Sequence, residues 1–172
     1  MNAAADGRAA KCDPRVIAAL GELVPRIAGC FRDPWWVIGS AAAHLVAAPE
    51  IVPHDIDVLA SAHDVDAFAA RHGDVLDRDY RPGDGARFRS RFARFAFAPL
   101  PVELMGGLEV DDGRGWRAVH VGATRMVDCD GQAIPLPTVA GQIRLFEWFG
   151  RDKDLEKARI LRRHARETAD AG

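Results

Sequence analysis

Helical spacing of apolar residues, and in one case an alanine-rich run, predicts helices in several stretches of the chain. Asp13-Pro14 is a pair typical of a helix start, and Pro25 should kink or end the helix that follows. Gly150 should end the fourth helix, and Asp152 can begin the fifth. The expected helices cover residues 14–27, 41–48, 63–72, 139–149 and 153 onward.

Short apolar or alternating runs predict strands between these helices. The phenylalanines of residues 88–97 change parity partway, so we expect a β-bulge near Ala93 and Arg94. Gly106-Gly107 should end the strand that begins at residue 101. Strands are expected over residues 35–38, 54–59, 88–97 and 101–105, with short further strands over 116–121 and 132–136. The order of elements favours an α/β (α+β) class, a mixed β-sheet flanked by helices.

Composition indicates a single domain over residues 13–172, preceded by a disordered tail over residues 1–12. The 172 residues are 48% apolar, which is enough for a core, and no linker or repeat divides them. The net charge of −2 argues against a general affinity for nucleic acid. The chain shows no signal-peptide pattern and no run of the roughly 20 apolar residues that a membrane span needs. We therefore expect a cytoplasmic protein with no membrane partner.

Two aspartates provide the first candidate chemistry. Asp55 and Asp57 lie two residues apart on a predicted strand, so their side chains point to the same face. Two neighbouring carboxylates repel each other unless a cation lies between them, and Mg²⁺ binds such carboxylates together with substrate phosphates. The alternative is a pair of exposed aspartates on a strand edge.

Two other positions make the metal hypothesis more specific. Gly39-Ser40 lies between a strand and a helix, where a phosphate can approach the backbone and bind the free N–H groups of the helix. Ser40 could instead serve only as the helix cap. Glu103, among apolar neighbours on a later strand, could be a third carboxylate beside the pair or an exposed strand residue.

These motifs together resemble the signature of the DNA polymerase β-like nucleotidyltransferase superfamily. The order of that signature is found here: an apolar residue followed by Gly39-Ser40, then a helix, then Asp55-x-Asp57. An acidic residue on a later strand completes it. The segment from Gly150 to Leu155 also resembles the Arg-x-Lys-Asp-Leu segment of small bacterial members, including stand-alone nucleotidyltransferases and AbiEii-type toxins. In such proteins the preceding helix usually provides a lysine. Here that neighbourhood reads Leu145-Phe146-Glu147-Trp148, which leaves its phosphate binding open.

The resemblance implies a fold, a metal and a reaction. The fold would be the nucleotidyltransferase fold, and Mg²⁺ or Mn²⁺ would bind Asp55, Asp57 and Glu103. The substrate would be a nucleoside triphosphate, with ATP the first choice. Its monophosphate would pass to an unknown hydroxyl acceptor on a small molecule, a protein or an RNA. The residues assigned to the nucleotide are Gly39, Ser40, Arg89, Arg91, Arg151 and Lys153.

Three alternatives stay open at this stage. Arg89 and Arg91 share strand parity, so they would bind phosphate together or else form part of a solvated strand face. The whole domain could be a regulatory binding module with little turnover, related to toxin–antitoxin systems. A metal-dependent phosphohydrolase fits less well, because no His–Asp ligand set is evident in the sequence.

Overall fold

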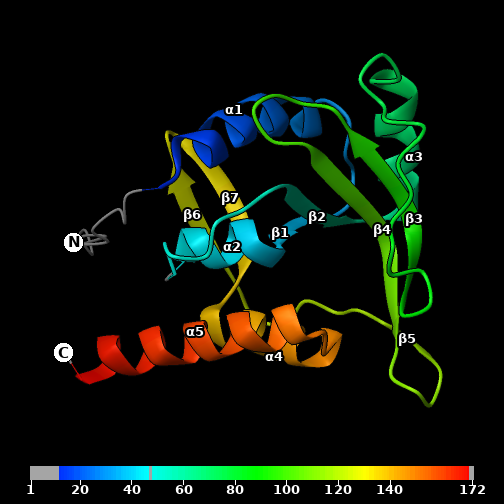
Figure 1. Cartoon of the computed structure of the whole chain (residues 1–172). Coiled ribbons are helices and arrows are strands. Elements are labelled where there is room, and N and C mark those ends of the chain that lie inside the picture. Colours follow the sequence, from blue (N-terminus) through cyan, green and yellow to red (C-terminus); the bar gives the residue numbers. More distant parts are fainter. Residues whose placement is uncertain (1–11, 47, 171–172) are drawn as a thin grey trace.

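The computed structural model describes residues 12–46 and 48–170, which form one five-stranded sheet, a separate hairpin and the helices around them (Figure 1). The helices are α1 (Pro14–Ala28), α2 (Gly39–Val46), α3 (Ala62–Arg71), α4 (Val139–Phe149) and α5 (Asp152–Asp170). The strands are β1 (Trp36–Ile38), β2 (Ile56–Ala60), β3 (Phe88–Phe95), β4 (Val102–Asp111), β5 (Trp116–Ala118), β6 (Thr124–Cys129) and β7 (Gln132–Pro137). The predicted α/β class is confirmed.

The sheet is mixed, with the order β1-β2-β4-β3 and with β5 paired to β4. Strands β2 and β4 are parallel neighbours, whereas the other pairings are antiparallel. Because β2 and β4 run side by side, Asp57 and Glu103 face each other as register partners. The topology therefore brings together two acidic residues that are far apart in the sequence.

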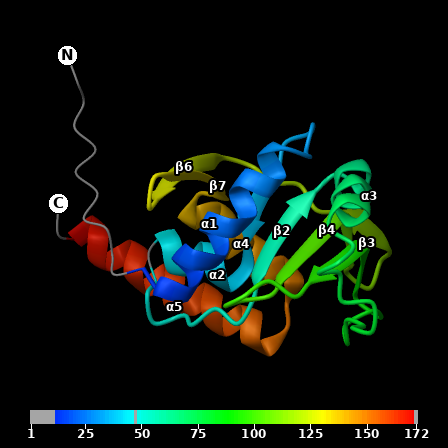
Figure 2. The same ribbon diagram turned by 90° about the horizontal axis from the view of Figure 1, so that it is seen from above.

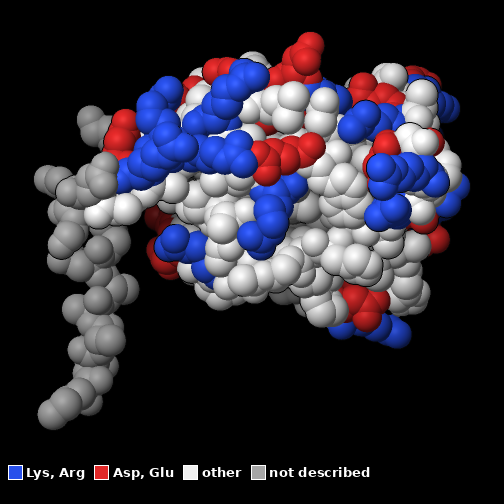
Figure 3. Space-filling view, turned by 90° about the horizontal axis from the view of Figure 1, so that it is seen from below, with Lys and Arg blue, Asp and Glu red and all other residues white. Residues whose placement is uncertain are grey.

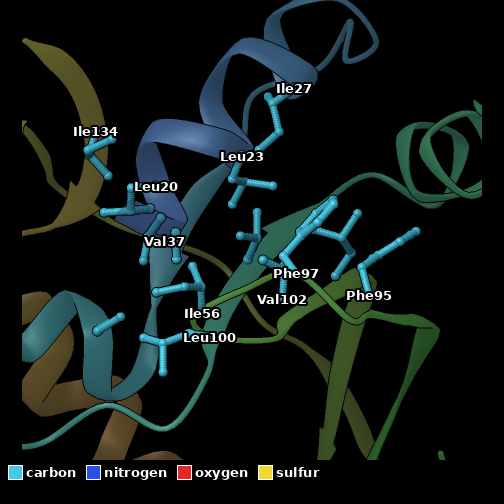
Figure 4. Packing of buried hydrophobic residues seen from close by; sticks show 14 of the residues in the cluster. Leu20, Leu23, Ile27, Val37, Ile56, Phe95, Phe97, Leu100, Val102 and Ile134 are labelled. Carbon is cyan, nitrogen blue, oxygen red and sulfur yellow. The ribbon is translucent and has the colours of Figure 1, made fainter. Parts of the chain in front are cut away.

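Both faces of the sheet are covered. Helices α1 and α3 lie on one face, and α4 and α5 lie on the other (Figures 1 and 2). Alternation along β2 sends Ile56 and Val58 into the core under α1 and α3, and Leu59 toward the opposite core. Figure 4 shows Leu20, Leu23 and Ile27 of α1 packing above the strands.

Helix α1 continues through Pro25, which corrects the predicted kink or end. A proline inside a helix costs about 3 kcal/mol. Leu23 and Ile27, on either side of Pro25, are almost fully buried, and each contributes roughly 1.5–3 kcal/mol on burial. Packing of this helix face therefore outweighs the local cost of the proline.

Strand β4 also continues past its predicted end at Gly106-Gly107. Gly106 is needed for close packing, because a Cβ there would lie 2.6 Å from the Cα of Ala62. Gly107 has a φ of +58°, and the register with β3 shifts opposite these glycines, between Arg89 and Arg91. The irregularity thus lies earlier in β3 than the bulge predicted near Ala93 and Arg94.

Strands β6 and β7 form the separate two-stranded hairpin, of which only the β7 region was predicted as a strand. The predicted tail over residues 1–12 lies outside the described residues except for Cys12. Cys12 is partly buried and packs against the core cluster that includes Cys129 at the end of β6. Over the described residues, every helix is too short or too polar to cross a membrane.

Candidate active site

Three carboxylates converge on the face of the sheet that α4 and α5 cover. Asp55 lies directly before β2, Asp57 lies within it, and Glu103 lies on β4. One oxygen from each side chain lies within 4.8 Å of the others. The three acidic residues proposed from the sequence therefore lie together on the same face of the sheet.

The three charges repel one another strongly. Burial raises the pKa of Asp57 well above its usual value, and the charges of Asp55 and Glu103 raise it further. The pKa of Glu103 is also raised, first by burial and then by Asp55, although Arg94 and Tyr80 oppose the shift. Such a group of oxygen ligands fits a hard divalent cation, which would remove this repulsion.

The start of α2 lies against the Asp57 carboxylate. Gly39 joins β1 to α2 with a φ of +68°, a backbone angle that residues with a side chain rarely adopt. A Cβ at this position would lie 2.4 Å from Oδ2 of Asp57. Gly39 is therefore required by the carboxylate itself, and the next residue, Ser40, lines the cavity at the helix N-terminus.

A cavity of about 430 Å³ opens above the carboxylates. It lies between the sheet, the start of α5, the end of α4 and the segment over residues 80–90. Its apolar wall includes Phe88, Met105 and Phe146, and its polar wall includes the carboxylates and two lysines. This composition suits a ligand that has both a charged part and a flat or apolar part.

Lys157 of α5 is a site residue that was not predicted from the sequence. Its ammonium group lies 5.6 Å from the ring centre of Phe146, and it faces Asp57 and Asp154. Burial lowers the pKa of Lys157, while the charge of Asp154 and then that of Asp57 oppose this shift. Phe146 lies on the helix from which the resemblance led us to expect a lysine. Here α5 brings a lysine to the same region.

A signal for Lys157 was present in the sequence. Lys153 and Lys157 are four residues apart, so they lie on one face of a helix. Lys153 is itself exposed and lines the cavity. The predicted assignment did not include Lys157 because the resembling segment ended at Leu155.

The arginines that were assigned to the nucleotide lie in different parts of the structure. Arg151 lines the cavity but forms ion pairs with Asp154 and Asp84, and so links α5 to the segment over residues 80–90. Arg89 lies at the cavity wall, 2.5 Å from Glu109, with its guanidinium 4.4 Å from the ring of Trp116.

Arg91 is not brought to the site. It pairs with Asp66 of α3 and does not line the cavity. The register shift between Arg89 and Arg91 separates two side chains that simple alternation would place together. The shared parity of the two arginines in the sequence therefore does not bring them to one site.

Tyr80 and Arg94 complete the site on its β3 side. Arg94 forms an ion pair with Glu103, and its guanidinium lies 4.1 Å from the ring centre of Tyr80. The Tyr80 side chain therefore lies beside Glu103, whose pKa it helps to lower. Burial raises the pKa of Tyr80, and the charge of Glu103 adds to this shift. Tyr80 was not predicted to belong to the site, and Arg94 was not among the arginines assigned to the nucleotide.

The basic residues farther along α5 do not extend this site. Figure 3 shows blue and red groups interspersed on the face that α4 and α5 form. Arg159 pairs with Glu156, Arg162 with Glu147, and Arg163 with Glu50. Since these charges are locally neutralised, this part of α5 gives no argument for a nucleic-acid surface.

Comparison with known proteins supports the fold. Comparison with models of protein families gives no match, and neither does comparison with curated proteins. A crystal structure of a "putative nucleotidyltransferase (TM1012)" from Thermotoga maritima is similar to this chain, with 22% identity and a TM-score of 0.64. The similarity covers 90% of this chain and 94% of that one.

A second solved structure, ANT(2″)-Ia in complex with adenylyl-2″-tobramycin, has 11% identity and a TM-score of 0.42, over 86% of this chain and 84% of that one. That score is too low to support an argument. The first comparison confirms the predicted nucleotidyltransferase fold. The resemblance to AbiEii-type toxins stays a prediction.

Proposed function

We propose that the protein is a metal-dependent nucleotidyltransferase, which transfers a nucleoside monophosphate from a nucleoside triphosphate to a hydroxyl acceptor. The observation on which this proposal rests is the convergence of Asp55, Asp57 and Glu103 within 4.8 Å, in a cavity beside a helix N-terminus and a lysine. The shared fold supports the proposal, because the fold matches the class that the sequence motifs resemble. ATP is the first nucleotide to test.

The three carboxylates would hold Mg²⁺ or Mn²⁺. Their oxygen ligands and their mutual repulsion fit a hard divalent cation, and fit poorly with an empty site at neutral pH. When bound, the metal neutralises charge on the phosphates and lowers the pKa of an attacking hydroxyl. Burial and the charges of Asp55 and Glu103 raise the pKa of Asp57, so this carboxylate should be sensitive to loss of metal.

The other residues would bind and orient the nucleotide. The N–H groups at the start of α2, next to Gly39 and Ser40, would bind phosphate oxygens. Lys157 and Lys153 lie on the same cavity wall and would hold the pyrophosphate as it leaves. Glu103 would accept the proton of the attacking hydroxyl. Arg151 would act indirectly, by holding the start of α5 against Asp84.

Lys157 also bears on the alternative of a regulatory module with little turnover. The lysine missing from the helix before Arg151 is one sequence argument for that module, and the lack of an added substrate domain is the other. Because α5 brings Lys157 to the cavity, the first argument loses its basis. A regulatory module would still bind nucleotide with metal but would not transfer it.

The test is transfer of label from α-labelled nucleoside triphosphates to acceptors in a cell extract, with Mg²⁺ or Mn²⁺. Label on the α-phosphate separates nucleotidyl transfer from kinase chemistry, which moves the γ-phosphate. Asp57→Asn should lower the rate on the order of 10³-fold, because the metal contributes several kcal/mol to the transition state. Asp66→Asn is the matched control, since Asp66 is an aspartate outside the cavity.

The outcomes separate three functions. Transfer that depends on Asp57 but not on Asp66 supports the enzyme. Metal-dependent binding of nucleotide without transfer to any acceptor would favour the regulatory module. Absence of binding with every nucleotide would refute the nucleotide hypothesis and leave only the fold.

A further inference from the structure

We propose that Tyr80 is itself an acceptor, so that the protein attaches a nucleoside monophosphate to its own tyrosine hydroxyl. This inference rests on the proposed function, because it uses the same carboxylates and the same nucleotide. Tyr80 is the single tyrosine of the chain, and it lies in the segment between α3 and β3 that forms one wall of the cavity. Its ring lies against Arg94, which forms an ion pair with Glu103, so the hydroxyl is on the Glu103 side of the cavity.

The ring of Tyr80 is held in place from several sides. The Arg94 guanidinium lies 4.1 Å from its ring centre, and Phe92 lies 5.9 Å away with a tilt of 30°. The backbone N–H of Tyr80 donates to Oδ1 of Asp77 over 3.1 Å. A phenol restrained in this way points its hydroxyl in one direction, and that direction is the Glu103 carboxylate.

The order of strands places Tyr80 on the side from which an acceptor should attack. Ser40 follows β1, Asp57 lies on β2, Glu103 on β4 and Phe92 on β3, and this is also the order across the sheet. The helix N-terminus that would bind the leaving pyrophosphate therefore lies on one side of the carboxylates. Tyr80, packed on Phe92, lies on the other side.

Phosphoryl-type transfer places the attacking and leaving oxygens roughly in line through the phosphorus atom. An α-phosphate bound over Asp57 and Glu103, with its pyrophosphate toward Ser40, would therefore present its opposite face toward Tyr80. The bond from Oη of Tyr80 to the α-phosphorus forms as the bond from that phosphorus to the bridging oxygen breaks. The phenolic proton passes to Glu103, and pyrophosphate leaves with the bridging oxygen.

Two other hydroxyl groups line the described cavity, on Ser40 and Ser90. Ser40 lies at the N-terminus of α2, on the side of the leaving group. Ser90 lies on β3 at the register shift, several residues from Arg94, which is the register partner of Glu103. Tyr80 is therefore the hydroxyl best placed to attack. Its modification would fill the attack side and prevent transfer to other acceptors.

The first experiment measures the mass of the intact protein after incubation with Mn²⁺ and each nucleoside triphosphate in turn. We expect a single added nucleoside monophosphate, on the peptide that contains Tyr80, approaching one per chain. Tyr80→Phe keeps a ring over Arg94 and beside Phe92 but removes the nucleophile, so it should lower adduct formation at least 100-fold. Unchanged thermal melting of this variant would show that it is folded.

Mixing two variants tests whether the reaction is intramolecular. Asp57→Asn keeps Tyr80 but should lack activity, whereas Tyr80→Phe keeps the carboxylates but lacks the acceptor. An equimolar mixture should yield no adduct on either chain. An adduct on the Asp57→Asn chain would overturn the inference, because Tyr80 would then be modified by a second molecule.

Iodination of Tyr80 gives a readout that does not need turnover. A non-hydrolysable α,β-methylene nucleotide with Mn²⁺ should slow iodination of Tyr80 at least five-fold, because the nucleotide would cover its hydroxyl. Equal iodination rates with and without the bound analogue would overturn the inference.

The failures of the two proposals are distinguishable. Transfer of label to acceptors in an extract, with Tyr80 unmodified or with the adduct on another residue, would overturn the self-modification but leave the proposed function. Absence of both nucleotide binding and transfer would overturn both. An adduct on Tyr80 that is lost in Tyr80→Phe and in Asp57→Asn supports both.

Discussion

The two faces of the sheet are built from the same strands but are closed to different degrees. Under α1 and α3 the core is sealed, with Phe95 fully buried and its ring centre 4.9 Å from that of Phe68. Under α4 and α5 the apolar packing stops short of the carboxylates and leaves the cavity of about 430 Å³. Stability is therefore concentrated on the first face, and the candidate chemistry on the second.

Side-chain alternation lets the same strands contribute apolar residues to one face of the sheet and acidic residues to the other. Val58 of β2 and Leu104 of β4 point into the sealed core, whereas Asp57 and Glu103 point into the cavity. The strands are held by burial on one side, so the repelling carboxylates on the other side can be tolerated. We therefore expect the acidic residues of this site to oppose folding in part, because they repel one another.

The largest expected difference is between Phe95→Ala and Asp57→Asn. Phe95→Ala should lower the free energy of unfolding by about 3–5 kcal/mol, because it opens a cavity in the sealed core. Asp57→Asn should leave the metal-free protein as stable as before or more stable, since it removes one of three repelling charges. Urea denaturation without metal measures both effects.

Mn²⁺ provides the control for this pair. It should stabilise the parent protein and Phe95→Ala by similar amounts but fail to stabilise Asp57→Asn. A large loss of stability in metal-free Asp57→Asn would contradict the division between the two faces. The aspartate would then have a structural role.

The next largest effect is expected at Gly39. Gly39→Ala forces a side chain into the left-handed region and against Oδ2 of Asp57, so it should cost about 1–3 kcal/mol and weaken Mn²⁺ stabilisation. Gly83→Ala is the matched control, because a Cβ at Gly83 would meet nothing within 4 Å. Calorimetry with and without Mn²⁺ should show a small effect, within about 0.5 kcal/mol, for the control. Equal Mn²⁺ stabilisation in Gly39→Ala would place the metal elsewhere.

Much of the fold and the acidic part of the site could be predicted because they depend on local periodicity and on motifs. Alternation placed Asp55 and Asp57 on one face, and the glycine-serine pair marked the helix start beside them. The predicted end of β4 at Gly106 was wrong for a tertiary reason. Gly106 is a glycine because α3 packs against it, and no local pattern shows that contact.

The residues missed at the site reach it through packing between elements. Lys157 enters the cavity because α5 lies on the sheet, and Tyr80 enters because its segment lies beside β3. Arg91 was assigned to the nucleotide because the register shift in β3 could not be located from the sequence. Residues on one strand or one helix start could thus be assigned, whereas those that depend on how elements pack could not.

A moderate effect is expected from a change at Lys157, which alters the cavity face under α4 and α5 but leaves the carboxylates in place. Lys157→Met keeps the length of the side chain near Phe146 but removes its charge, so nucleotide affinity should fall about ten-fold, or about 1.4 kcal/mol. Mn²⁺ binding should be retained. Arg159→Met is the control, since Arg159 pairs with Glu156 and does not line the cavity. Isothermal titration calorimetry measures both variants, and equal affinity in Lys157→Met would exclude this lysine from nucleotide binding.

The smallest expected effect is a dependence of stability on pH, caused by the carboxylates on the cavity face under α4 and α5. Burial, followed by the charges of Asp55 and Glu103, raises the pKa of Asp57 above the usual 3.8, so the folded protein holds this proton more tightly than the unfolded chain. The associated stability is fully present below the unfolded pKa and is lost as the pH rises through the folded pKa.

Other carboxylates, such as that of Glu109 beside Arg89, have lowered pKa values and give the opposite slope. The measurement is therefore the difference between the parent protein and Asp57→Asn, by urea denaturation without metal from about pH 4 to about pH 7. The variant should gain stability relative to the parent as the pH rises. Saturating Mn²⁺ should reverse this difference, because the metal binds the ionised carboxylates. A difference that does not change with pH would show that Asp57 stays ionised in the metal-free protein, and that the cavity face tolerates its charges without a cation.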